Sequence, residues 1–91
     1  QAGELGVWDW RIDRDEFTFN PHMAEMLGYA SRELSRRDDW LALIHPDDAA
    51  ACGARMREHL AGRESFLTAE IRLRTHAGGW RWIIDRGQVV A

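Results

Sequence analysis

Four histidines are the residues of this chain that first suggest a metal or haem site. His45 directly precedes a proline that can open a helix, so capping of that helix explains it more simply than ligation does. His22 follows an Asn-Pro pair and His76 lies in a predicted hairpin turn, and we expect both to be solvated. His59 lies on the predicted long helix. No cysteine and histidine have the spacing of zinc ligands, so the sequence predicts no metal site.

Cys52 is the single cysteine, so an internal disulfide is impossible and a reducing, cytoplasmic compartment fits best. It lies among alanines, where a thiol usually packs as a small apolar residue. Asp47 and Asp48 are adjacent, and neighbouring residues on a helix point about 100° apart, so their carboxylates do not converge on one ligand. Their place in a first helical turn opposes the positive end of the helix dipole instead. We predict no catalysis, because no nucleophile–base pair and no phosphate-binding loop is present.

Three arginines near the C-terminus, Arg72, Arg81 and Arg86, could line an anion site. Cross-strand ion pairs with Glu70 and Asp85 explain them more simply. The whole chain has 12 basic and 15 acidic residues, a net charge of −3, and no basic patch. A nucleic-acid partner is therefore not predicted.

The N-terminal elements that carry these residues are predicted from periodicity. Residues 6–13 alternate, with Trp8, Trp10 and Ile12 on one side, which is typical of a half-buried strand. Residues 16–20 repeat the same period, so the two segments form a hairpin. Asn20 is expected to cap a short helix that begins at the following proline, and further short helical pieces extend to residue 44.

The C-terminal half contains the longest predicted helix and a second hairpin. Pro46 opens the helix, which runs to about residue 61 and ends at Gly62. Residues 65–75 and 80–87 alternate again around a Gly-rich turn. The order strand, strand, helices, strand, strand predicts an α+β fold, with an antiparallel sheet covered by helices on one face. A chain of 91 residues supports a single core, and no apolar run approaches the roughly 20 residues needed to span a membrane.

Taken together, these features resemble a PAS domain, and more narrowly the PAS/PAC subtype called PAS fold 3. The resemblance covers nearly the whole chain and rests on Trp8-x-Trp10, Asn20-Pro21, Met26-Leu27-Gly28-Tyr29, Glu33, Trp40, Ile44-His45-Pro46-Asp47-Asp48, His59-Leu60, Phe66, Glu70-x-Arg72, Gly79-x-Arg81-Trp82 and Arg86-Gly87. It implies a sensory or interaction module of a bacterial signalling protein, such as a histidine kinase of a two-component system, a diguanylate cyclase, a phosphodiesterase or a chemoreceptor. None of those catalytic signatures occurs in this sequence.

The resemblance implies a five-stranded antiparallel sheet, of which this chain contains four strands. Residues 6–13 and 15–20 resemble the first two strands, and residues 64–75 and 79–90 the third and fourth. The family's fifth strand lies between the first and the fourth, and it should follow a few residues after Ala91. We therefore expect residues 1–91 to be a single PAS domain that is incomplete at its C-terminus. Two unpaired internal strand edges would result, to be filled by another copy or a neighbouring element.

In PAS domains the space between helices and sheet holds haem, flavin or a small metabolite, or is filled by side chains. The family's haem ligand falls near Ala51-Cys52 and not at His59, which disfavours haem. The reactive cysteine of light-sensing relatives falls in residues 42–45, which contain no thiol, so covalent flavin chemistry is also disfavoured. We expect no cofactor, and the sequence does not identify a ligand.

The interior and the outer face of the sheet each have candidate residues. We predict that an interior pocket is lined by Met26, Trp40, Leu43, Ile44, Met56, Leu60, Ile71 and Trp82. A sheet covered on one side cannot bury both faces, so part of the tryptophan cluster is expected to contact a flanking helix or a second copy. The interface candidates are Trp8, Trp10, Trp80 and Ile83.

The leading functional hypothesis is a sensory and dimerisation module that relays a ligand or conformational cue to an effector domain elsewhere in the same protein. The first alternative is an interaction domain without a ligand, whose pocket is filled by its own side chains. The second is a haem or flavin sensor. A cavity of at least ~300 Å³ would favour a ligand site, and a packed interior would favour the first alternative.

Overall fold

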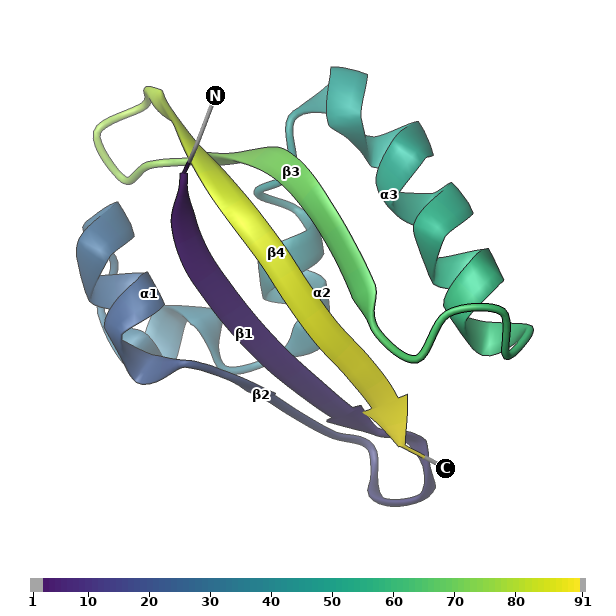
Figure 1. Cartoon of the computed structure of the whole chain (residues 1–91). Helices are drawn as coiled ribbons and strands as arrows, with labels where there is room; N and C mark the ends of the chain where they lie inside the picture. Colours follow the sequence, from purple (N-terminus) through teal and green to yellow (C-terminus); the bar gives the residue numbers. More distant parts are fainter. Residues whose placement is uncertain (1–2, 91) are drawn as a thin grey trace.

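The computed structural model describes residues 3–90, which form a four-stranded sheet with helices on one of its faces (Figure 1). Its elements, in chain order, are β1 (Glu4–Arg11), the 3-10 turn η1 (Ile12–Arg14), β2 (Glu16–Phe19), α1 (Pro21–Leu27), the 3-10 turn η2 (Ser31–Leu34), α2 (Arg37–Leu41), α3 (Pro46–Leu60), β3 (Leu67–Arg74) and β4 (Trp80–Val90). The α+β class and both predicted hairpins are confirmed.

The helix ends follow the local signals of the sequence, with one exception. His45 is the N-cap of α3, and its Nδ1 accepts a hydrogen bond of 3.0 Å from the backbone N–H of Asp47, as predicted. Gly28 ends α1 with a φ of 90°, a conformation that favours glycine. Asn20 precedes α1, but its side chain does not cap that helix. Its Oδ1 instead accepts a bond of 3.2 Å from the Val7 N–H, which ties the first hairpin together.

The sheet has the strand order β2-β1-β4-β3, and its two central strands pair directly. β1 and β4 are parallel neighbours over their length, from Glu4 opposite Ile83 to Arg11 opposite Val90. The sheet is therefore mixed, and the expected pair of unpaired internal edges is wrong for this structure. The physical reason is that each strand satisfies the backbone N–H and C=O groups that the other would otherwise leave unpaired.

Close packing of the central strands depends on glycine. Trp8 lies opposite Gly87 in the β1–β4 register. A Cβ atom at Gly87 would lie 2.1 Å from the indole ring of Trp8, a distance that no side chain can tolerate. Gly87 therefore gives the Trp8 ring its place on the inner face of the sheet.

The core lies between the helices and the inner face of the sheet. Its most deeply buried side chains are Met23, Leu27, Leu67 and Ile83. The outer edge of β3 is covered by the segment before α3, through hydrogen bonds of 2.9 Å from Arg74 N–H to Leu43 C=O and from His45 N–H to Arg72 C=O. The other face of β1 and β4 has no helix over it in the described part of the chain (Figure 1).

Candidate functional site

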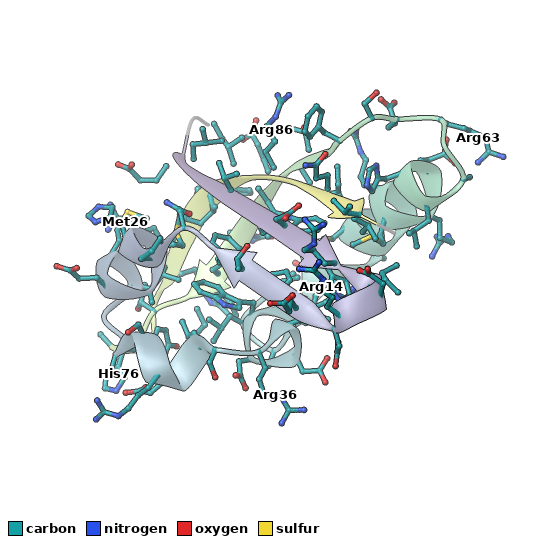
Figure 2. All side chains as sticks on the ribbon, turned by 90° about the horizontal axis from the view of Figure 1, so that it is seen from below. Arg14, Met26, Arg36, Arg63, His76 and Arg86 are labelled. Carbon is teal, nitrogen blue, oxygen red and sulfur yellow. The ribbon has the colours of Figure 1, made fainter. Side chains whose placement is uncertain are left out.

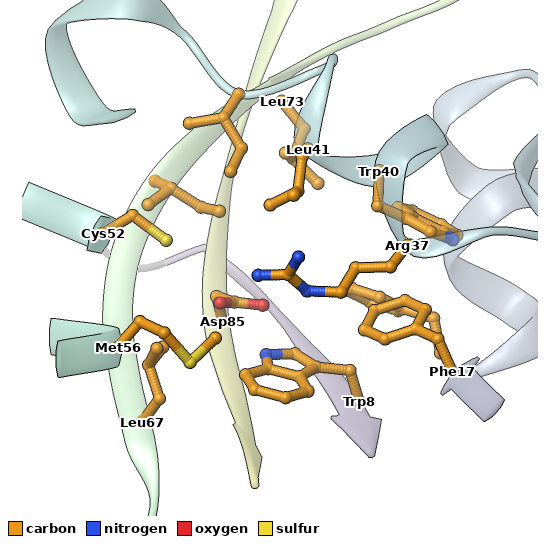
Figure 3. Close-up of a pocket in the computed structure, with 13 residues that line it drawn as sticks. Trp8, Phe17, Arg37, Trp40, Leu41, Cys52, Met56, Leu67, Leu73 and Asp85 are labelled. Carbon is orange, nitrogen blue, oxygen red and sulfur yellow. The ribbon is translucent and has the colours of Figure 1, made fainter. Parts of the chain in front are cut away.

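A small, partly open cavity lies between the inner face of the sheet and the helices (Figure 3). Its volume is about 40 Å³. This space is large enough for ordered water but far below the roughly 300 Å³ of a typical small-molecule site. Aromatic and aliphatic side chains make most of the wall, and the full lining is Trp8, Phe17, Phe19, Arg37, Trp40, Leu41, Ile44, Cys52, Met56, Leu67, Ile71, Leu73 and Asp85.

Asp85 is the buried charged residue among the described residues, with only 6% of its surface exposed. It lies on the inner face of β4, where Gly6 of β1 and Ala69 of β3 are its neighbours in register. Burial raises the pKa of its carboxyl group from 3.8 to about 7, and a hydrogen bond with the Trp8 side chain acts in the opposite direction. Figure 3 shows the indole nitrogen of Trp8 facing this carboxyl group. Asp85 is therefore a proton-binding group in the interior.

Two further ionisable side chains reach the cavity, Arg37 from α2 and Cys52 from α3. The guanidinium carbon of Arg37 lies 4.2 Å from the centroid of the Trp10 ring. Burial raises the pKa of the Cys52 thiol, and the nearby carboxyl group of Asp85 acts in the same direction. A thiol with a raised pKa is a poor nucleophile, which agrees with the packing role expected for Cys52.

The structure brings four of the predicted pocket residues to the cavity and leaves four elsewhere. Those that line it are Trp40, Ile44, Met56 and Ile71. Met26 and Leu43 are partly buried and pack against the core without reaching the cavity. Leu60 is 55% exposed at the last position of α3. Trp82 is 37% exposed, because alternation along β4 turns it to the face opposite Ile83.

Sequence reasoning missed the polar group of the cavity. Asp85 was expected to pair with arginines across the strands, but it lies on the inner face with Ile83 and Gly87. Residues two apart on a strand share a face, so alternation groups Asp85 with Ile83 and Gly87. Because Trp82 and Ile84 make the opposite face apolar too, alternation alone does not identify which face lies inside.

The interface candidates divide between the two faces of the sheet. Trp8 and Ile83 are 5% and 0% exposed and belong to the inner face, so the structure places them in the core and not at a surface. Trp10 is partly buried under the Arg37 guanidinium. Trp80 is exposed on the outer face of the sheet, the face that the described helices leave uncovered. The exposed apolar side chains of this face are Leu5, Val7, Phe66, Trp80 and Trp82. We call this set the outer aromatic face.

Arginines flank the outer aromatic face. Figure 2 shows Arg86 on the opposite side of the sheet from Arg36, which precedes α2. The guanidinium groups of Arg72, Arg74 and Arg86 lie 4.9, 5.4 and 4.4 Å from the ring centroids of Trp82, Trp80 and Phe66, respectively. These distances are those of cation–π contacts, so the surface presents aromatic rings together with positive charge.

Arg72 also forms an ion pair, although its partner is not the one expected. Its Nε and Nη2 donate to the two carboxylate oxygens of Asp48 on α3, at 3.0 and 2.9 Å, and its backbone N–H donates to the same carboxylate at 2.8 Å. The predicted pair with Asp85 is wrong because that carboxyl group faces inward. The hydrogen bond from the Arg72 side chain lowers the pKa of Asp48. This charged pair attaches α3 to the edge of β3.

The histidines have structural partners or lie in solvent. The Nε2 of His59 accepts a bond of 2.8 Å from the Val89 N–H, and its Nδ1 lies 2.8 Å from the Glu64 carbonyl oxygen. Both ring nitrogens are thereby used, so this side chain is not free to ligate haem iron. His22 and His76 are exposed, as expected. Within residues 3–90, no three His, Cys, Asp or Glu side chains gather as metal ligands would, and no helix has the length and apolarity needed to cross a membrane.

Comparison with known proteins places the fold in a family. Residues 16–91 match the family described as PAS fold. A crystal structure of a sensory box histidine kinase/response regulator from Burkholderia thailandensis E264 is 33% identical in sequence and superimposes with a TM-score of 0.60. The match covers 82% of the present chain and 55% of the solved chain, so our chain spans about half of that structure. A search of curated proteins found no match.

Proposed function

Because this chain belongs to the PAS fold family, we propose that it is a signal-relay module of a larger bacterial signalling protein, without an organic ligand in its interior. The module itself performs no catalysis. Its output goes to an effector domain in the same polypeptide, and the likeness to a sensory box histidine kinase/response regulator supports a kinase as that effector. Its single unpaired cysteine supports a cytoplasmic setting.

The cavity volume is the observation that carries the proposal. At about 40 Å³ the cavity is several times smaller than the roughly 300 Å³ at which metabolite sites begin. Its aromatic walls are in mutual contact, with the Phe19 and Trp40 rings stacked 4.1 Å apart and the Trp8 and Phe17 rings 5.9 Å apart. These side chains leave little room at this site for a metabolite, haem or flavin, and the two neighbouring hollows, of about 190 and 220 Å³, also stay below that size. This supports the interaction domain over the ligand sensor and the cofactor sensor.

The outer aromatic face is the surface through which we propose that the module contacts a second copy of itself. Leu5 and Val7 of β1 lie beside Ile84 and Arg86 of β4 in the parallel register, so the exposed apolar side chains of two central strands are contiguous. Contiguous apolar surface of this kind is typical of interaction sites. Alternation on β4 links it to the cavity, because Ile84 faces outward between the inward-facing Ile83 and Asp85.

Two measurements test the proposal. Thermal unfolding of the purified domain with a broad panel of metabolites should give no saturable shift, and its visible absorption spectrum should be featureless. Light scattering after size exclusion should report a dimer that Val7→Glu dissociates. Leu60→Glu is the matched control, because it changes another exposed apolar residue, which lies on α3 away from this face. A metabolite that raises the melting temperature saturably would overturn the ligandless interior, and a monomer at every concentration would overturn the dimer.

A further inference from the structure

We propose that Asp85 and Arg37 form a proton-controlled latch between β4 and α2. When Asp85 is neutral, the Arg37 guanidinium rests on the Trp10 ring at the cavity wall, and when Asp85 is ionised, the guanidinium leaves the ring to pair with the carboxylate. The latch would supply the proposed relay function with a cue that needs no organic ligand. Only the signalling role of the latch rests on that proposed function.

The geometry of the cavity supports this inference. The Asp85 carboxyl group is almost completely buried, and the walls around it are otherwise largely apolar. An ionised carboxylate in such surroundings needs a countercharge, because burial removes the water that would otherwise stabilise an unpaired ion. Arg37 is the cationic side chain in the lining of this cavity. Figure 3 shows its guanidinium group directed from α2 toward the Asp85 carboxyl group.

The other elements around Asp85 contribute no competing cation. β1 and β3 place Gly6 and Ala69 beside it in register, and both lack charge. Cys52 of α3 is the remaining titratable group of the cavity, and burial raises its pKa, so it is neutral when Asp85 titrates. Beyond the cavity lining, the Asp48 carboxylate is already bound by the guanidinium of Arg72.

The latch links a proton to the contacts that the start of α2 makes with β1 and β4. Arg37 is the first residue of α2, and its guanidinium now covers Trp10 of β1 at 4.2 Å. The same helix carries Trp40, which donates a hydrogen bond of 2.8 Å to the Leu34 carbonyl and stacks on Phe19 of β2. Transfer of the guanidinium from the Trp10 ring to the Asp85 carboxylate exchanges a contact with β1 for one with β4, while Trp40 keeps α2 attached to the hairpin.

The test follows the Asp85 carboxyl carbon, the Arg37 Nε–H and the Trp10 indole N–H by nuclear magnetic resonance, from about pH 5 to about pH 9. We expect all three signals to change with one midpoint below the pKa of about 7, because that value contains no contribution from Arg37 and pairing with the guanidinium favours the ionised carboxylate. Asp85→Asn should abolish the transition at Arg37 and Trp10. Arg37→Met keeps the aliphatic stem but removes the charge, and it should raise the Asp85 midpoint by about 1–3 units. Arg36→Met, the neighbouring and exposed arginine, is the matched control and should leave the midpoint unchanged.

Two results would overturn the latch. One is a carboxyl group that titrates while the Arg37 and Trp10 signals stay constant. The other is the same Asp85 midpoint in wild type and Arg37→Met, which would show that the guanidinium does not pair with the ionised carboxylate. Both are read from the isolated domain, so they are separable from the dimer measurement that tests the proposed function.

Discussion

Replacement of Asp85 by Asn should stabilise the protein at neutral and alkaline pH, and hardly at all near pH 4. The carboxyl group has a pKa of about 7 in the folded protein against an ordinary value of 3.8. Because the folded pKa is the higher one, the folded state binds this proton more tightly than the unfolded state. The stability that it contributes is complete below the unfolded pKa and is lost as pH rises through the folded pKa.

The size of the effect follows from that difference. A shift of about 3 pKa units at 1.36 kcal/mol per unit corresponds to roughly 4 kcal/mol, lost between about pH 4 and about pH 8. Pairing with Arg37 after ionisation would reduce this loss. Asn is uncharged and nearly isosteric, and its Oδ1 can accept the Trp8 hydrogen bond, so the variant avoids the loss. The difference in unfolding free energy between variant and wild type should therefore grow with pH.

Urea unfolding followed by tryptophan fluorescence at about pH 5 and about pH 8 measures this difference. Asp13→Asn, a change at an exposed carboxylate of η1, is the control and should show no such trend. Asp48 has the opposite sign, because its pKa is lowered and its contribution is lost only as pH falls below its ordinary value of 3.8. The two pH windows are thus separate. A wild-type protein that equals or exceeds Asp85→Asn in stability at pH 8 would refute the reasoning.

Three further changes test other parts of the fold. Removal of both ring nitrogens in His59→Ala should cost about 1–3 kcal/mol in urea unfolding, because it leaves a β4 amide without an acceptor, whereas His22→Ala at an exposed site should cost little. Gly87→Ala should destabilise the protein by about 1–3 kcal/mol or more, because the new methyl group collides with the Trp8 ring. Gly53→Ala in the interior of α3, where the nearest atom is 3.7 Å away, should instead stabilise the protein by about 0.5–1 kcal/mol. A Gly87→Ala variant more stable than Gly53→Ala would contradict the packing described.

Local rules predict the elements of this fold well, because each element has its own start signal or residue periodicity in the sequence. Pro46 and His45 fix the start of α3, and strict alternation fixes both hairpins. The same alternation also decided which residues share a face. The expectation that Ile83 lies at an interface fails, because Ile83 occupies the inner face of β4 together with Asp85. Face assignment needs to know which side the helices cover, and a strand with apolar residues on both faces does not reveal that.

The cavity could be predicted only in part, for a related reason. Trp40, Ile44, Met56 and Ile71 were identified because their types and helical or strand positions favour the core. The polar members of the lining were not, since an aspartate in an alternating strand ordinarily faces solvent and pairs with a neighbouring base. Only tertiary structure determines that an acidic residue stays inside, and the chemistry of this interior depends on that residue.

β1 and β4 pair directly, whereas the number of strands in the sequence led us to expect a gap between them. The two strands run parallel, which is the relative direction that two strands have when a single antiparallel strand lies between them. Their direct contact requires a match of side chains across the junction, and the chain provides one, with Trp8 opposite Gly87 and Asp85 opposite Gly6. Each pair joins a large or polar side chain to a glycine, so the inner face closes without collision and the Trp8 side chain reaches the Asp85 carboxyl group. The same junction that closes the sheet therefore also creates the buried proton-binding group.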